Sequence, residues 1–256
     1  MIDLLLDLDG TVYLSNQIIN RSDIWIRSAW ERGVKINYMT NNTSVSLETY
    51  KTKLQSMGIY FPETKIISPT TILSDWIIQN GVREIFLVGT DGLRSDLENL
   101  TGIVTNSDNP ELVVVGFDTE LTFEKIKRAS EHINSGVVWY QTHIDLNCPS
   151  SKGPIPDCGA ISKLLEATTG VPPKDHFGKP GWKMVDFLKG EFSSSTKIIV
   201  IGDRLYTDVE IGLRLNAETI LVCSGEFQPD GKDLSNDSIK TFSDLSTYLK
   251  FFLENC

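Results

Sequence analysis

Cysteine, histidine and basic residues are all scarce in this chain, and each shortage narrows the functions to consider. Four cysteines in 256 residues show neither Cys-x-x-Cys spacing nor the density of a disulfide framework, so we expect a cytoplasmic protein. The three histidines, His132, His143 and His176, are scattered, so we expect them to be solvated or structural and not to bind zinc. Lysine and arginine number 24 against 34 aspartates and glutamates, and a net charge of −10 argues against a nucleic-acid partner.

Long apolar runs are lacking as well. No stretch approaches the roughly 18 apolar residues that a membrane span needs, and the N-terminal residues are partly acidic, unlike the basic and then apolar pattern of a secretion signal. We therefore expect no membrane partner. The hydrophobic content of 40% is ordinary for a protein with a sizeable core. The length suits one large α/β domain, or a core domain that carries a second one.

Two aspartates directly follow a short apolar run at residues 2–6, which is typical of a buried strand. Because residues i and i+2 of an extended chain project to the same side, Asp7 and Asp9 are expected to crowd, and such crowding raises the pKa of one carboxyl group. A divalent cation, or a division of labour between nucleophile and acid, would relieve the repulsion. Gly10 permits a sharp turn there and Thr11 adds a hydroxyl group. The alternative is an ordinary turn in which the aspartates cap the strand.

Strand and helix patterns alternate along the rest of the chain. We expect further strands at residues 34–39, 65–67, 84–88, 111–116, 137–141, 197–201 and 218–223, and helices at 23–32, 47–57, 69–79, 93–100, 122–133, 159–168, 184–188, 209–215 and 245–253. This alternation predicts a doubly wound parallel α/β sheet. Because the pattern restarts near residue 82 and pauses at a Val-Pro-Pro stretch, it also predicts a smaller α/β domain at residues 82–174, inserted between core segments 1–81 and 175–256.

Two polar segments offer donors for an anion. The first is Thr40-Asn41-Asn42-Thr43-Ser44, which follows the strand expected at residues 34–39; its alternative role is a plain helix N-cap. The second is Lys179, which stands between a glycine and a proline in an expected loop, where a solvated surface charge is the alternative. Hydroxyl, amide and ammonium groups of this kind suit an oxyanion such as a phosphoryl group.

Two more aspartates come after the strand expected at residues 197–201. Asp203 follows it directly, and ligands of open α/β sheets bind at the carboxyl ends of strands, so we expect Asp203 near Asp7 if the two strands are neighbours. Asp208 is expected to begin a helix, where a carboxylate also suits the helix dipole. Asp7, Asp9 and Asp203 form an all-oxygen set of the kind that Mg²⁺ prefers.

Taken together, these motifs resemble those of the haloacid dehalogenase (HAD) superfamily phosphatases. The four motifs, in the family's order, are Asp7-x-Asp9-Gly10-Thr11, Thr40-Asn41-Asn42, Gly178-Lys179-Pro180 and Gly202-Asp203-Arg204-x-x-Thr207-Asp208. The insert between the second and third motifs resembles the NagD-like branch, which includes p-nitrophenyl phosphatases and pyridoxal phosphatases. The resemblance implies a Rossmann-like core with an α/β cap. It also implies Mg²⁺-dependent hydrolysis of small phosphate monoesters (sugar, triose, cofactor or aryl phosphates) through an aspartyl-phosphate.

The resemblance also implies roles for single residues. Asp7 would be the nucleophile, and Asp9 the general acid and base, with its main-chain carbonyl on the metal. Asp203 would bind the metal directly, and Asp208 through a water molecule. The residues that would bind the phosphoryl group or substrate are Thr40, Asn41, Asn42 and Lys179.

The inserted segment would act as a cap that selects the substrate. Asp145, Asn147 and Cys148 follow the strand expected to end at residue 141 and are the candidates for contact with the leaving group; an ordinary surface turn is the alternative. The branch often has aromatic or histidine residues where this chain has residues 146–148, so the substrate itself stays open. A homodimer formed through the cap is a further expectation.

Two other function classes share this chemistry. A phosphomutase or phosphotransferase on the same scaffold would use the same aspartyl-phosphate, so the sequence separates it poorly from a phosphatase. A non-enzymatic signalling module with a phosphorylated aspartate would be roughly half this length. A haloalkanoate dehalogenase needs no Mg²⁺ and would have little use for Asp9.

Overall fold

The computed structural model describes residues 2–149, 152–192, 196–228 and 239–255. Cys256 lies outside these ranges, as do residues 150–151, which precede the helix predicted at 159–168. Contacts group the chain into two compact units, which are described separately. The first unit comprises Met1–Thr40, Tyr50–Ile67 and Val185–Cys256, and the second comprises Asn41–Thr49 and Ser68–Met184. The predicted domain boundaries, after residue 81 and before residue 175, stay a prediction.

The first unit contains a six-stranded sheet with the order β13-β12-β11-β1-β4-β5. Every pair of neighbours runs parallel, which confirms the predicted parallel sheet. The strands are β1 (Ile2–Asp7), β4 (Lys35–Met39), β5 (Ile66–Ile67), β11 (Lys197–Gly202), β12 (Glu218–Val222) and β13 (Ile239–Phe242). β13 was not predicted, nor was the small antiparallel pair β2 (Tyr13–Leu14) and β3 (Gln17–Ile18).

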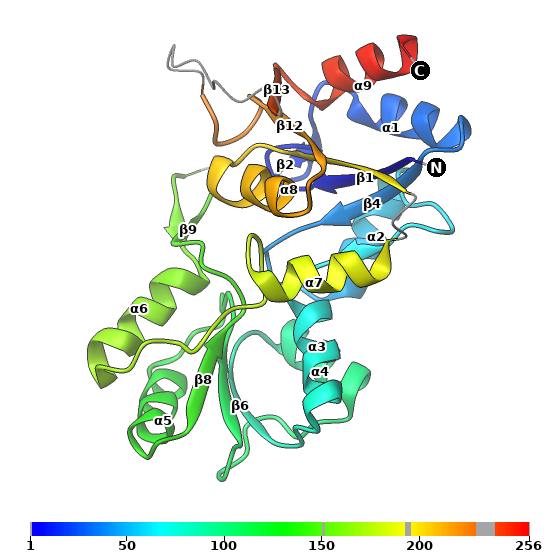
Figure 1. The fold of residues 1–256 in the computed structure, drawn as a ribbon. Coiled ribbons are helices and arrows are strands. Elements are labelled where there is room, and N and C mark those ends of the chain that lie inside the picture. Colours follow the sequence, from blue (N-terminus) through cyan, green and yellow to red (C-terminus); the bar gives the residue numbers. More distant parts are fainter. Residues whose placement is uncertain (1, 150–151, 193–195, 229–238, 256) are drawn as a thin grey trace. The chain divides into compact units, whose positions relative to one another are not determined.

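The helices of the first unit follow the strands in alternation (Figure 1). They are α1 (Ser22–Glu31), α8 (Glu210–Arg214), α9 (Leu245–Glu254) and most of α2 (Leu47–Ser56) and α7 (Trp182–Glu191), the last two being shared with the second unit. Helices α1 and α9 contact each other. A parallel sheet has helices on its faces, which explains why its central strands are continuous apolar runs with no polar alternation.

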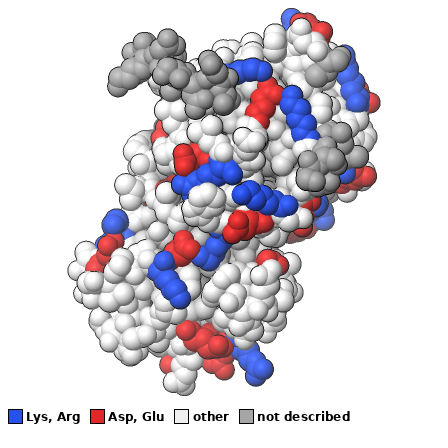
Figure 2. Space-filling view, in the orientation of Figure 1, with Lys and Arg blue, Asp and Glu red and all other residues white. Residues whose placement is uncertain are grey.

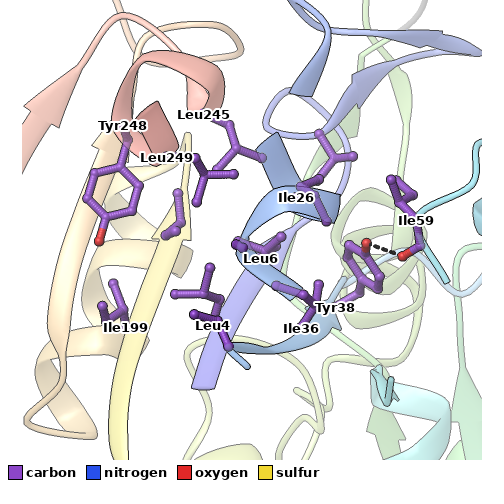
Figure 3. Packing of buried hydrophobic residues seen from close by; sticks show 14 of the residues in the cluster. Leu4, Leu6, Ile26, Ile36, Tyr38, Ile59, Ile199, Leu245, Tyr248 and Leu249 are labelled. Carbon is purple, nitrogen blue, oxygen red and sulfur yellow. Dashed lines mark hydrogen bonds between the residues drawn. The ribbon is translucent and has the colours of Figure 1, made fainter. Parts of the chain in front are cut away.

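The core of the first unit joins the central strands to α1 and α9 (Figure 3). Leu4 and Leu6 of β1 are fully buried, and the Tyr38 hydroxyl of β4 donates to the Ile59 carbonyl at 2.6 Å. The other labelled members of this cluster are Ile26, Ile36, Ile199, Leu245, Tyr248 and Leu249. Burying each such side chain is worth about 1.5–3 kcal/mol, so this packing holds the central strand ends in place.

The second unit contains a three-stranded parallel sheet with the order β6-β7-β8. Its strands are β6 (Ile85–Val88), β7 (Leu112–Val115) and β8 (Val138–Gln141), and its helices are α3 (Pro69–Asn80), α4 (Asp91–Thr101), α5 (Phe123–Asn134) and α6 (Cys158–Thr169). The predicted alternation of strands and helices in this segment is confirmed. A short antiparallel pair, β9 (Asn147–Cys148) and β10 (Ile155–Pro156), was not predicted.

Charged side chains of both signs intermingle on the face of the molecule in Figure 2. Ion pairs of the first unit include those of Lys197 and Lys240 with Glu218, at 2.8 and 2.7 Å. Such exposed pairs contribute on the order of 0–1 kcal/mol each. Among the helices of the described residues, none has both the length and the apolar character to cross a bilayer.

Candidate active site

Asp7 and Asp203 stand at the carboxyl ends of two neighbouring strands of the first unit. Asp7 is the last residue of β1, and Asp203 directly follows β11. The two strands pair in parallel with Leu6 opposite Ile201, which confirms the prediction that these aspartates come together. Asp7 is 8% exposed and Asp203 is 2% exposed. Both carboxyl groups are therefore largely withdrawn from water.

Asp208 joins them from a π-helical turn at Leu205–Val209, which precedes α8. The prediction that Asp208 begins an α-helix was wrong, because the wider π-helical turn comes first. Its carboxylate accepts a hydrogen bond from the Arg204 main-chain N–H at 3.1 Å, so it folds back toward the strand end. A Cβ atom at Gly202 would overlap the Asp208 side chain, which explains why β11 ends in glycine.

These three aspartates form a group that suits a divalent cation. Carboxylate oxygens of Asp7, Asp203 and Asp208 all lie within 4.8 Å of one another, and all three residues are buried. Three anions this close repel strongly when water is excluded, and a cation relieves that repulsion. The donors are all hard oxygens, which matches Mg²⁺ better than zinc. The Asp9 carboxylate is not a member of this group, and metal binding through the Asp9 main-chain carbonyl stays a prediction.

Asp9 instead lies in a tight turn beside the group. It is half-buried, and the turn closes through the Gly10 N–H, which donates to the Tyr13 carbonyl at 2.8 Å. Gly10 has φ +93°, and a Cβ there would lie 2.6 Å from Oδ2 of Asp203. Glycine is thus required both for the backbone angle and for the close approach. Asp9 is thus two residues from Asp7 but more exposed than the three members of the group.

Lys53 packs its ammonium group over the aromatic ring of Tyr13, the residue that closes this turn. The Lys53 ammonium is 3.4 Å from the ring centroid of Tyr13 and donates to the Ser15 carbonyl at 2.7 Å. Burial raises the pKa of Tyr13, and the Asp9 carboxylate raises it further, so this phenol stays neutral. Burial lowers the pKa of Lys53, and attraction to Asp9 opposes that shift. Lys53 therefore adds positive charge near Asp9.

The loop after β12 encloses Asp203 and was missed by the sequence reasoning. The Glu226 N–H donates to Oδ2 of Asp203 at 2.6 Å, and the Ser224 hydroxyl donates to the Gly10 carbonyl at 2.7 Å. A Cβ atom at Gly225 would overlap the Asp203 carboxylate. The available signal was a Ser-Gly pair just after the last predicted strand, at the same sheet edge as the aspartates.

Asn41 and Lys179, which belong to the second unit, are held to each other through main-chain atoms. The Lys179 N–H donates to Oδ1 of Asn41 at 2.7 Å, and Nδ2 of Asn41 donates to the Lys179 carbonyl at 3.1 Å. Nδ2 of Asn41 also donates its second hydrogen to Oδ2 of Asp145, at 3.0 Å. Both amide donors of Asn41 are thus used within the protein. Only its main-chain N–H can serve as the predicted phosphoryl donor.

The other predicted anion-binding residues lie at the end of β4 and just after it. Thr40 is 3% exposed, and its N–H donates to the Ile67 carbonyl at 3.0 Å, which fixes its place beside β5. Oδ1 of Asn42 accepts from both the main-chain N–H and the hydroxyl of Ser44, at 2.8 and 2.7 Å. This is an Asx turn, which holds the loop after Asn41 in shape.

The three predicted cap residues lie in different environments. Asp145 is 3% exposed, Asn147 is exposed and Cys148 is half-buried in β9. His143 is fully buried, with one ring nitrogen 2.8 Å from Asp157 and the other 2.9 Å from Thr142. With Asp145 and Asp157 it forms a second buried group whose side chains could hold a metal ion, so the expectation that the histidines are solvated or structural stays a prediction. A ligand role in substrate selection stays a prediction for Asp145, Asn147 and Cys148.

Known protein families match both the N-terminal and the C-terminal part of the chain. Residues 4–102 match a family described as haloacid dehalogenase-like hydrolase, and residues 176–245 match a second HAD-hydrolase-like family. Among curated proteins, the acid sugar phosphatase of Staphylococcus aureus is 28% identical over 223 residues, which cover 86% of each chain.

Solved structures agree with this assignment over nearly the whole length. A 4-nitrophenylphosphatase from Thermotoga maritima is 34% identical with a TM-score of 0.88, covering 97% of this chain and 96% of the other. A p-nitrophenyl phosphatase from Archaeoglobus fulgidus is 26% identical with a TM-score of 0.86, covering 97% and 98%. The fold, the grouped aspartates and these relatives agree: the chain belongs to the haloacid dehalogenase-like hydrolases and is a phosphatase of that family.

Proposed function

We propose that this protein hydrolyses small phosphate monoesters, such as sugar or aryl phosphates, in a Mg²⁺-dependent reaction through an aspartyl-phosphate. One observation carries the proposal. Asp7, Asp203 and Asp208 place three buried carboxylates within 4.8 Å at the carboxyl ends of neighbouring parallel strands. An all-oxygen group of this kind fits Mg²⁺, which takes few protein carboxylates together with substrate phosphate oxygens.

The chain's own residues account for both halves of the reaction. A carboxylate oxygen of Asp7 attacks phosphorus, the bond from phosphorus to the ester oxygen breaks, and Asp9 gives its proton to the departing oxygen. Water then attacks phosphorus of the aspartyl-phosphate and returns a proton to Asp9. The bond from Asp7 to phosphorus breaks, which releases inorganic phosphate and restores the enzyme.

Asp9 suits the proton role because of where the turn places it. It is half-buried and outside the three-aspartate group, whereas Asp7 lies within it. Two carboxyl groups in different environments can divide the roles of nucleophile and acid.

The remaining groups stabilise negative charge on the phosphoryl oxygens. Mg²⁺ held by Asp7, Asp203 and the main-chain carbonyl of Asp9, and by Asp208 through a water molecule, would neutralise part of that charge when bound. We assign the other donors to the Thr40 hydroxyl, the Asn41 main-chain N–H and the Lys179 ammonium. Lys179 is 2% exposed, and a cation withdrawn from water interacts more strongly with an anion than an exposed one does.

Selection of the ester, association and location are further parts of the proposal. Asn147 and Cys148 are exposed and half-buried respectively, which leaves their side chains accessible to a leaving group. Exposed Leu121 and Phe123 on the second unit offer apolar surface for the expected homodimer. The scarcity of cysteine favours the cytoplasm.

Phosphate release from a panel of sugar, triose, cofactor and p-nitrophenyl phosphates tests the function. The purified chain is assayed as prepared, after exhaustive chelation, and after Mg²⁺ or Zn²⁺ is added back. We expect hydrolysis that chelation stops, that Mg²⁺ restores and that Zn²⁺ restores poorly. Transfer of the phosphoryl group to an added sugar in place of water would instead indicate a phosphotransferase. Absence of phosphate release from every ester would contradict the proposal.

A further inference from the structure

We propose that Asp145 is a positioning residue that orients the Asn41 side chain and, through it, the Lys179 loop. This inference rests on the proposed function, because it assigns to Asp145 a task in phosphoryl binding. It differs from the expectation that Asp145 contacts the leaving group of the substrate. All the contacts that carry it lie within the second unit.

The first step is the complete use of the Asn41 amide. Its oxygen accepts from the Lys179 N–H at 2.7 Å. Its nitrogen donates to the Lys179 carbonyl at 3.1 Å and to the Asp145 carboxylate at 3.0 Å. Without Asp145 one buried N–H of this amide would lose its acceptor. An unsatisfied buried donor is costly, so the amide would be driven to another orientation.

The second step is that Asp145 is itself held rigidly. Its main-chain carbonyl accepts from the Gly159 N–H at 2.8 Å, in the first turn of α6. A Cβ at Gly159 would overlap the carbonyl groups of Ile144 and Asp145, so the backbones are closely packed. Asp145 is 3% exposed, which places its carboxylate away from solvent. A helix terminus thus fixes the main chain of the residue whose carboxylate accepts from Asn41.

The third step is that the residues just before Lys179 are closely packed. A Cβ at Gly178 would lie 2.6 Å from Oδ1 of Asn41 and 2.6 Å from Cβ of His143. The Phe177 N–H donates to the Thr142 carbonyl at 3.1 Å. Because the loop before Lys179 packs this tightly, a turned Asn41 amide would displace the Lys179 main chain. A charge-assisted hydrogen bond to a buried carboxylate is strong enough to prevent that turn.

Asp145→Ala tests the proposal on the full chain. Because the Lys179 loop acts on the phosphoryl group common to all esters, we expect kcat/KM to fall by the same factor for every ester, on the order of ten- to a hundred-fold. A factor that varies several-fold between esters would show contact with the leaving group and overturn the proposal. If wild type hydrolyses no ester at all, the proposed function fails, and the orientation of Asn41 by Asp145 is then tested by the amide measurement alone.

A double-mutant cycle with Asn41→Ala separates the direct from the indirect role. If Asp145 acts through Asn41, adding Asp145→Ala to Asn41→Ala should lower kcat/KM by less than two-fold further. A loss that multiplies with that of Asn41→Ala would overturn the proposal. Asp118→Asn is the matched control, because Asp118 is another buried carboxylate of the second unit and pairs with Lys125 at 2.8 Å. We expect it to lower the thermal midpoint while kcat/KM stays within two-fold.

A measurement independent of turnover uses the Asn41 side-chain amide. Its ¹⁵N-attached protons, assigned with Asn41→Ala, should exchange slowly with solvent in wild type because both are hydrogen-bonded. In Asp145→Asn, which preserves volume and serves if Asp145→Ala fails to fold, we expect one of them to shift and exchange faster, with a smaller but still ester-independent loss of kcat/KM. An unchanged Asn41 amide in this variant would overturn the proposal.

Discussion

The main chain of Gly225 lies against the carboxylate of Asp203 so closely that a Cβ atom at position 225 would overlap it. The next residue, Glu226, donates its N–H to the same carboxylate at 2.6 Å. Asp203 follows β11, whereas Gly225 belongs to the loop after β12. The loop of a neighbouring strand therefore covers the Asp203 carboxylate. The orientation of a proposed metal ligand therefore depends on a residue with no side chain.

Gly225→Ala is expected to displace Asp203. Overpacking of this kind costs about 1–3 kcal/mol in the free energy of unfolding, and the displaced carboxylate should raise the Mg²⁺ concentration needed for half-maximal activity. Urea unfolding and a Mg²⁺ titration measure the two effects. Gly190→Ala is the matched control, since nothing lies within 4 Å of a Cβ there and the position is within helix α7. Equal behaviour of the two variants would contradict the close packing.

Asp203→Ala should affect the metal more than the substrate. Because Asp203 is 2% exposed and its carboxylate lies with those of Asp7 and Asp208, its loss removes one of three proposed cation ligands. We expect the Mg²⁺ requirement to rise at least ten-fold while the substrate KM changes much less, as measured by crossed Mg²⁺ and substrate titrations. Asp186→Ala, on the exposed side of α7, serves as control. A larger change in KM than in the Mg²⁺ requirement would count against the metal role.

Asp7→Asn should abolish turnover and leave the fold intact. An amide is isosteric with the carboxylate but does not attack phosphorus, so the covalent step is lost. Phosphate release measures turnover, and borohydride trapping followed by peptide mass analysis should label Asp7 in wild type during turnover. The variant should show no label and an unchanged circular dichroism spectrum. Full activity in Asp7→Asn would exclude the aspartyl-phosphate.

Asp244 allows a prediction of how the free energy of unfolding depends on pH. It caps α9, where it accepts from the Thr247 N–H at 2.8 Å and from Asn20 at 2.9 Å. Burial raises the pKa of Asp244, but these hydrogen bonds outweigh it, so the pKa lies below the ordinary aspartate value. The carboxylate therefore stabilises the fold above the unfolded-state pKa of about 3.9, and this contribution is lost as the pH falls through the lower folded-state pKa.

The measurement is urea unfolding of Asp244→Ala and wild type between pH 2 and pH 7. We expect the variant to be less stable by about 1 kcal/mol at neutral pH, and the difference to shrink below about pH 3.9. Asp244→Asn keeps a capping oxygen without the charge and should show a smaller loss that varies little with pH. A difference that is constant down to pH 2 for Asp244→Ala would refute the role of the carboxylate.

The parallel sheet and the meeting of Asp7 with Asp203 could be predicted because both depend on local pattern. Apolar runs such as residues 197–201 indicate buried parallel strands, and a residue that ends such a strand has its place fixed by the sheet. The strand β13 has two exposed and two half-buried residues, so its sequence lacks that apolar signal. Its pairing with β12 is a tertiary effect.

The remaining parts of the site depend on contacts between distant segments. Asn41 and Lys179 are 138 positions apart, and nothing in either local sequence indicates that the amide of one bonds the main chain of the other. From the sequence, Asp145 could be assigned to a surface turn or to substrate contact. Its burial and its bond to Asn41 are seen only in the structure. The π-helical turn that carries Asp208 likewise has no sequence periodicity by which it could be distinguished from an α-helix.

Asp9→Asn tests whether Asp9 gives its proton to the leaving group. As general acid it assists an ester whose leaving group is a poor one, and losing such assistance typically costs about 10²–10⁴-fold. We expect a loss of that size in kcat for an alkyl phosphate. The loss in kcat should be much smaller for p-nitrophenyl phosphate, because its leaving group scarcely needs a proton. Both esters need Asp7 equally as the nucleophile. Steady-state kcat values for the two esters, in wild type and in Asp9→Asn, measure the difference, with Asp7→Asn as the variant whose loss does not depend on the ester. An equal loss for both esters would mean that Asp9 serves the metal and not the leaving group.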